Sequence, residues 1–234
     1  MATPPRFSTG SPDLNSGGST PSSDAGASTL VIETATAACS VALLRGGRVV
    51  DALHDVVGRG HAERLVPMIA ALPGRGRADA ILVDCGPGSF TGVRVGLAAA
   101  RGLGIGWGVP VTGFSSTALV AAASFAARPT LDALAVVLEG GHGEVFMQSF
   151  ARTGCTEMTP LQSLKPEAAR TALGALPAFG NGVRHLAALD PTLTPNDTLP
   201  HAADAWLLPP ALRALAPTPI YGRAPDAKPQ VAGA

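Results

Sequence analysis

The sequence is poor in cysteine, in aromatic residues and in charge. Its three cysteines, Cys39, Cys85 and Cys155, are far apart and form no C-x-x-C pair, which argues against a zinc ribbon or a disulfide framework and fits a reducing compartment. No two histidines have the H-x-x-x-H spacing of a helical metal site, so no metal is expected. The formal net charge is zero. The chain therefore lacks the strongly basic face with which proteins grip nucleic acid through its phosphates.

Long hydrophobic runs are also missing. No apolar run approaches the roughly 18 residues that cross a membrane, and the first residues lack the pattern of a secretory signal. We therefore expect a cytoplasmic protein that does not contact membranes. Hydrophobic residues nevertheless make up 46% of the chain and aromatic residues only 4%, so the predicted core is large, aliphatic and closely packed. A length of 234 residues fits one large domain or two small ones.

The pattern along the chain predicts an α/β protein. Residues 1–28 are rich in Pro, Gly, Ser and Thr and are predicted to be a disordered extension, with a start codon assigned too far upstream as the alternative. Apolar runs at 29–34, 39–44 and 48–57, separated by glycine turns, predict an antiparallel meander. Helices are expected at 61–72, 91–107 and 115–127, with strands at 80–84 and 109–114.

The second half repeats this order of elements. Predicted strands at 134–138 and 144–150 flank a glycine turn at 140–143, as the first two strands flank residues 35–38. A helix at 165–173, a strand at 177–182 and a final helix at 202–215, interrupted by Pro209 and Pro210, follow. We therefore expect an N-terminal lobe over 29–130, a related C-terminal lobe over 131–216 and an irregular tail over 217–234.

A glycine-rich turn at residues 86–92 leads into the longest predicted helix. Such a turn can present backbone N–H groups to a phosphate, which makes Gly86, Gly88, Ser89 and Thr91 a candidate phosphate loop. The spacing G-x-G-x-x-x-G is one residue too long for the dinucleotide fingerprint, and the lysine of a P-loop is absent. Proline at position 87 excludes a G-x-S-x-G nucleophile elbow. A tight turn that only positions the helix is the favoured alternative.

Small residues form a stripe along this helix. Gly92, Gly96, Ala100 and Gly104 are spaced by four and lie on one face. A glycine inside a helix costs about 1 kcal/mol relative to alanine, so the stripe indicates close approach of another backbone. We interpret the turn before it as a device that points the stripe outward, toward either the helix at 61–72 or a helix of a partner.

Other polar residues give weaker signals. Glu33, Asp84, Glu139 and Glu144 lie at or near strand ends, where acid–base residues occur in α/β folds, but nothing fixes a pair at catalytic separation. His61 begins a predicted helix, a position more typical of a capping or surface residue than of a ligand. The helix after the glycine turn also carries arginines at 94 and 101. Three roles are open for them: binding a phosphate, pairing with acidic residues of a partner, or simple exposure to solvent.

Four motifs, in order, resemble those of the TsaB (YeaZ) family. The longest is the stretch 86–104. The others are A-A-C-S-V-A-L at 37–43, H-A-E-R-L-V-P at 61–67 and P-I-Y-G-R-A-P-D-A-K at 219–228. The third accounts for an otherwise awkward proline inside a helix. The resemblance covers roughly residues 29–230.

This resemblance implies an actin-like ATPase (ASKHA) fold with two related lobes, mixed sheets and flanking helices. It also implies a non-catalytic partner that activates TsaD in forming threonylcarbamoyladenosine beside the anticodon of tRNAs. TsaE would join the larger complex, tRNA would be met only indirectly, and no cofactor would be intrinsic, although ATP or ADP could bind in the complex. TsaB-like proteins pair with TsaD, or with themselves, through two N-lobe helices. The implied interface residues here are His61, Leu65, Met68, Gly92, Val93, Gly96, Leu97, Ala100 and Gly104.

Two departures from the family pattern bear on nucleotide chemistry. Glu33 stands where the family usually has aspartate, and Glu139-Gly140-Gly141 replaces D-A-R in the second lobe. Both weaken the alternative hypothesis, a small-molecule kinase or ATPase of the same fold acting on its own. A protease is disfavoured because the sequence carries neither a metal motif nor a nucleophile elbow.

Overall fold

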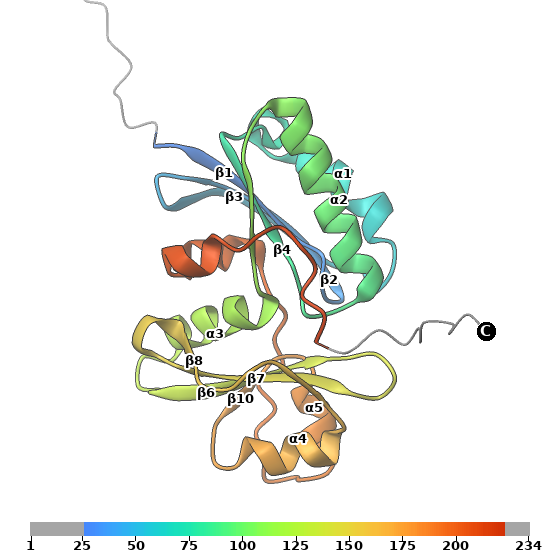
Figure 1. Ribbon diagram of the computed structural model, residues 1–234, viewed down its shortest axis with the longest axis vertical. Helices are drawn as coiled ribbons and strands as arrows, with labels where there is room; N and C mark the ends of the chain where they lie inside the picture. Colours follow the sequence, from blue (N-terminus) through green and yellow to red (C-terminus); the bar gives the residue numbers. More distant parts are fainter. Residues whose placement is uncertain (1–25, 223–234) are drawn as a thin grey trace, which may run out of the picture.

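The computed structural model describes residues 26–222. The predicted extension therefore lies outside the described residues except at its end, where Ser28 already pairs in the first strand. Residues 223–228 of the C-terminal motif also lie outside them. Two sheets, one in each half of the chain, form two lobes with a helix between them (Figure 1).

The N-terminal lobe is built on a five-stranded sheet. Its strands are β1 (Ser28–Glu33), β2 (Ala38–Arg45), β3 (Arg48–Val56), β4 (Ala80–Asp84) and β5 (Val111–Phe114), in the order β3-β2-β1-β4-β5. The first three are antiparallel, which confirms the predicted meander, and β4 and β5 continue the sheet in parallel. The central parallel strand β4 is a short aliphatic run, as expected for a strand buried on both faces.

Two helices cover one face of this sheet (Figure 1). Helix α1 (His61–Ala71) tolerates Pro67 on its exposed side, and α2 (Phe90–Trp107) lies beside it. A short 3-10 turn, η1 (Pro73–Gly76), follows α1 and leads to β4. The apolar side chains beneath the helices are almost all aliphatic, as the composition predicts.

The C-terminal lobe repeats the central part of the first. Strand β6 (Ala133–Glu139) pairs antiparallel with β7 (Val145–Ala151) and parallel with β10 (Ala178–Phe179), as β1 pairs with β2 and β4. The short strands β8 (Thr156–Glu157) and β9 (Gln162–Leu164) also pair with β7, and neither was predicted from the sequence. The 3-10 turn η2 (Thr153–Cys155) precedes β8.

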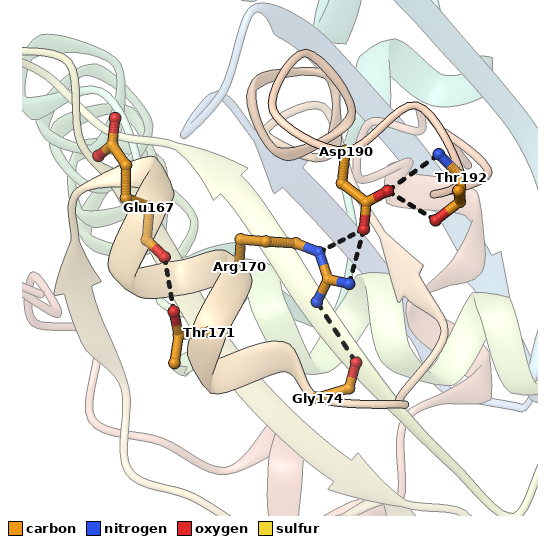
Figure 2. Close-up of polar contacts among 6 residues, drawn as sticks. All are labelled: Glu167, Arg170, Thr171, Gly174, Asp190 and Thr192. Carbon is orange, nitrogen blue, oxygen red and sulfur yellow. Dashed lines mark hydrogen bonds and ion pairs between the residues drawn. The ribbon is translucent and has the colours of Figure 1, made fainter.

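The helices of the C-terminal lobe are short and are held together by polar contacts. Helix α4 (Pro166–Leu173) and α5 (Val183–Ala187) lie below the second sheet. Figure 2 shows the Arg170 guanidinium of α4 paired with the carboxylate of Asp190, which also accepts hydrogen bonds from the backbone and hydroxyl of Thr192. The segment after α5 is thereby tied to α4.

Helix α3 (Ser116–Ala127) fills the space between the sheets. Nine of its residues are buried, because it packs against both lobes and against η3 (Ala202–Leu207). The predicted α-helix over 202–215 is wrong: the segment forms two 3-10 turns, η3 and η4 (Pro210–Arg213). The two consecutive prolines at 209 and 210 remove amide donors and prevent one continuous helix.

The chain then returns to the N-terminal lobe. Leu215 exchanges two backbone hydrogen bonds with Gly113 of β5, and the amide of Ile220 donates to the carbonyl oxygen of Cys85 over 2.7 Å. Arg101 of α2 donates to the carbonyl oxygen of Pro217. This closing segment, residues 215–222, covers the free edge of β5. No helix within residues 26–222 is long and apolar enough to cross a membrane.

Candidate functional site: the interlobe cleft and the helix pair

A cleft of about 790 Å³ lies between the lobes. The N-terminal lobe contributes the turn at 35–37 and the loop that leads into α2. The C-terminal lobe contributes residues 139–142 and Asn181, and the closing segment contributes residues 220–222. The cleft therefore lies where the two glycine turns singled out from the sequence face each other.

An internal carboxyl group already occupies the turn at 34–37, which follows β1. Glu33 Oε1 accepts hydrogen bonds from the amides of Ala35 (2.8 Å) and Thr36 (3.3 Å). Those amides are the donors that a turn of this kind would offer to a phosphate. Because Glu33 is completely buried, its hydrogen bonds stay with the turn.

The glycine loop packs directly on the same turn. The amide of Ser89 donates to the carbonyl oxygen of Ala35 over 2.6 Å, and a Cβ at Gly88 would lie only 1.9 Å from that oxygen. Gly86, with φ at +96°, is buried, while Gly88, Ser89 and Thr91 line the cleft. The Ser89 hydroxyl accepts from the amide of Gly92 and so caps α2. The loop thus has a structural role, and its role as a phosphate loop remains a prediction.

The stripe of small residues faces inward, so the predicted outward orientation is wrong. A Cβ at Gly92 would lie 2.0 Å from the carbonyl oxygen of Thr34, and one at Gly96 would lie 2.5 Å from the Thr34 hydroxyl. A Cβ at Gly104 would lie 2.5 Å from the side chain of Val111. The backbone that approaches α2 therefore belongs to the end of β1 and the strands beside it. Neither α1 nor a partner helix is needed to explain these glycines.

The remaining residues of the predicted interface are buried as well. His61 is 6% exposed, and its Nε2 lies 2.9 Å from the carbonyl oxygen of Thr36 and 3.0 Å from that of Ala38. Nε2 therefore carries a hydrogen, and His61 anchors the turn after β1 rather than capping a helix on the surface. The buried set is His61, Leu65, Met68, Gly92, Val93, Gly96, Leu97, Ala100 and Gly104.

Different residues form the outer face of the helix pair. Val66 of α1 and Ile105 of α2 are 63% and 84% exposed. On α2, Gly102 and Gly106 are exposed, and a Cβ at either position would meet nothing within 4 Å. The sequence spacing missed these two glycines because the inward stripe is longer and more regular. We call the exposed face formed by Val66, Ile105, Gly102 and Gly106 the outer helix face.

An aromatic and cationic group borders both the cleft and the start of α2. The Arg94 guanidinium lies 3.3 Å from the centre of the Phe90 ring and donates to the Tyr221 hydroxyl over 3.1 Å. The rings of Phe90 and Tyr221 are 6.0 Å apart, and both side chains are more than half exposed. Sequence reasoning placed Arg94 on a helix face but missed this contact, because Tyr221 is distant in the chain.

The four carboxylates noted in the sequence separate into two groups. Glu33 and Asp84 are buried together at the ends of β1 and β4. Glu139 and Glu144 lie in the second lobe, where Glu139 pairs with Arg184 and His185, and Glu144 accepts from Ser163. Burial acts to raise the pKa of Glu139, but the hydrogen bonds and charges of its two partners lower it overall. Glu139 is therefore a charged structural residue at the rim of the cleft.

The net pKa shift has the opposite direction in the first group, where burial dominates. Burial raises the pKa of Asp84 to about 7, against the hydrogen bonds from Gly86 and Ser116. The pKa of Glu33 is also raised well above its ordinary value by burial and by the charge of Asp84. Among residues 26–222, no three His, Cys, Asp or Glu side chains form a cluster suited to a metal ion.

Comparison with known proteins supports one family. Residues 54–166 match the model for TsaD, tRNA N6-adenosine threonylcarbamoyltransferase. An uncharacterized protein of Mycobacterium tuberculosis is 32% identical over 218 residues, or 86% of this chain and 93% of the relative. A crystal structure from Pseudomonas aeruginosa, described as similar to peptidase YEAZ, has a TM-score of 0.68 and 29% identity over 84% of this chain and all of that chain.

The chain belongs to the TsaB (YeaZ) family. The proteins named "tRNA threonylcarbamoyladenosine biosynthesis protein TsaB" from Escherichia coli and Haemophilus influenzae are 36% and 35% identical over 128 residues. That alignment covers 53% of this chain and spans about half the length of each of these two relatives. The predicted fold class, an actin-like α/β fold with two mixed sheets flanked by helices, is confirmed.

Proposed function

We propose that this chain is a non-catalytic partner of a TsaD-type protein in the formation of threonylcarbamoyladenosine on tRNA. The similarity to two proteins named for threonylcarbamoyladenosine biosynthesis is the observation that carries the proposal. The match of residues 54–166 to the TsaD model adds support, because related chains of one fold often pair with each other. TsaE would join the larger complex, and tRNA would be contacted mainly by the partner.

The geometry of the turn at 34–37, after β1, supports the non-catalytic role. A phosphate-binding turn needs free amide donors, and here the Glu33 carboxylate uses those of Ala35 and Thr36. A bound phosphate would have to displace this buried carboxyl group from the two amides. The rim residue Glu139 is held by Arg184 and His185. These contacts leave ATP or ADP a role only in the complex, where the partner can supply donors.

The outer helix face is the proposed contact surface. Its glycines at 102 and 106 have no neighbour within residues 26–222 that requires them, yet each costs about 1 kcal/mol in an exposed helix. Close approach of a partner backbone would offset that cost. The neighbouring exposed apolar residues, Val66 and Ile105, supply surface that gains free energy when buried. The same face would serve self-association when TsaD is absent.

Co-purification with TsaD from the same organism tests this proposal. Gly102→Arg places a long charged side chain on the outer helix face, at a position where a Cβ meets nothing within 4 Å among residues 26–222. We expect it to weaken the complex at least tenfold while leaving the melting temperature within a few degrees of the wild type. Ala172→Arg, at an exposed position of α4 in the other lobe, is the matched control and should bind normally.

Two results would contradict the proposal. Equal binding by Gly102→Arg and Ala172→Arg would place the interface elsewhere. ATP turnover by the isolated chain, lost in Glu33→Gln, would support the alternative of an independent kinase or ATPase. The threonylcarbamoyladenosine content of tRNA in a depleted strain, restored by the wild type and not by Gly102→Arg, links the contact to the modification.

A further inference from the structure

The carboxyl groups of Glu33 and Asp84 are buried side by side beneath the turn at 34–37 and the glycine loop at 86–89. Strand β1 pairs in parallel with β4, with Ile32 opposite Val83, so the next residues, Glu33 and Asp84, are neighbours at the ends of adjacent strands. Ile32 and Val83 pack under the helices α1 and α2. Because side chains alternate along a strand, Glu33 and Asp84 point to the opposite face, toward α3.

Each carboxyl uses one oxygen and leaves the other without a partner. Glu33 Oε1 accepts from two amides of the turn, and Asp84 Oδ1 accepts from the amide of Gly86 (2.7 Å) and the hydroxyl of Ser116 (2.8 Å). Glu33 Oε2 and Asp84 Oδ2 are buried and make no hydrogen bond within residues 26–222. A buried acceptor without a donor costs free energy, and a buried unpaired charge costs more.

No cation in the described part of the chain balances the two charges. Within residues 26–222, neither carboxyl forms an ion pair with Arg, Lys or His. The thiols of Cys39 and Cys85, whose pKa values are raised by burial and then by the charges of Glu33 and Asp84, lie in the cluster under α1 and α2 on the other face of the sheet. Asp204 of η3 interacts instead with His54 and His201. The amino-terminal end of α3, at Ser116, favours one negative charge at Asp84, but not a second.

We propose that Glu33 and Asp84 form an acid pair that retains one proton at neutral pH and thereby holds the turn at 34–37 against the loop at 86–89. The proton removes one of two adjacent buried charges and converts a carboxyl oxygen without a partner into a donor. Two carboxyl groups so placed titrate as a pair, so the proton belongs to the pair rather than to one residue. Loss of the proton places two carboxylates at the junction and weakens it.

The direction of the pH dependence follows from the raised pKa values. The pKa of Asp84 rises from 3.8 to about 7, and that of Glu33 rises from 4.5. The folded chain therefore binds protons more tightly than the unfolded chain, so the stability from this pair is complete below about pH 4 and falls as the pH rises through 7. Each retained proton changes the unfolding equilibrium constant by up to tenfold per pH unit. The raised pKa values of Cys39 and Cys85, about 11 and 12, place the thiols above this range.

Urea unfolding of the full chain between pH 6 and 9 tests the proposal. Glu33→Gln and Asp84→Asn replace a carboxyl by a neutral amide of similar shape. Each should lose less stability than the wild type between pH 6 and 9, with at least a tenfold smaller change in the unfolding constant across that range. The exposed residue Glu63 supplies the control, and Glu63→Gln should follow the wild type. Histidines contribute equally to all these profiles and cancel in the differences.

A second measurement does not depend on folding of the variants. Difference infrared spectroscopy of the wild type between pH 6 and 9 should show the C=O band of a buried carboxylic acid that disappears as the pH rises. Its absence at pH 6, or variant profiles parallel to the wild type, would overturn the proposal. So would stabilisation of the wild type at pH 8 by magnesium ions that Glu33→Gln abolishes, because a bound cation would then balance both carboxylates.

Discussion

The two lobes support their helices in different ways. In the N-terminal lobe, glycines on the inner face of α2 let it lie directly on the backbone at the end of β1. In the C-terminal lobe, α4 and α5 pack through ordinary side chains such as Leu173 and Leu186, and Arg170 ties α4 to Asp190. The first arrangement fixes the helix position closely, whereas the second tolerates small shifts. The difference agrees with the proposal that the N-terminal lobe carries the contact surface.

The largest effect is expected at the closest contact. Gly92→Ala places a Cβ 2.0 Å from the carbonyl oxygen of Thr34, and neither the helix nor the strand end can move without breaking hydrogen bonds. We expect a loss of about 3 kcal/mol or more in the free energy of unfolding. Urea denaturation followed by circular dichroism measures it. An unchanged midpoint would mean that α2 is not seated on the strand as described.

The same substitution on the outer face should have the opposite sign. Gly102→Ala meets no atom within 4 Å and removes a flexible residue from a helix, so we expect stabilisation by about 1 kcal/mol. It is the matched control for Gly92→Ala, because the helix and the chemical change are the same. Destabilisation by Gly102→Ala would show that the outer face is already covered within the chain.

The smallest effect is expected in the C-terminal lobe. Hydrogen bonds from Thr192, followed by those from Arg170, lower the pKa of Asp190 from 3.8 to about 2. Its contribution is therefore present above about pH 4 and lost as the pH falls toward 2. Asp190→Asn should lower the melting temperature slightly at pH 7, because exposed ion pairs contribute little. The difference from the wild type should disappear near pH 2, and a constant difference would assign the effect to the amide itself.

Sequence patterns predicted most of the fold because local signals and the family motifs agreed. The meander, the three long helices and the repeat of the strand pattern all follow from apolar periodicity and glycine turns. The 3-10 turns and the short strands β8 and β9 were missed, since contacts with other parts of the chain decide them. The sequence predicts that Pro209 and Pro210 interrupt a helix, whereas the structure has two 3-10 turns and no α-helix over 202–215.

The site was predicted less well, for one physical reason. Spacing by four shows that Gly92, Gly96 and Gly104 share a face, but it does not show which way that face points. Orientation depends on what lies opposite, here Thr34 and Val111. The pairing of Glu33 with Asp84 depends on strand register in the same way. Both residues were singled out as strand-end acids, and only the parallel pairing of β1 with β4 places them together.

The closing segment affects how the N-terminal lobe folds during translation. Residues 215–222 cover the edge of β5 and donate to the carbonyl oxygen of Cys85, directly beyond β4. The N-terminal lobe is therefore finished by a segment that is synthesised after the C-terminal lobe. Lobes usually fold in order of synthesis, but here the first must wait with an open strand edge until residues 215–222 have left the ribosome. Ribosome-bound chains that end before residue 215 should therefore be more sensitive to proteases within the N-terminal lobe than the released protein.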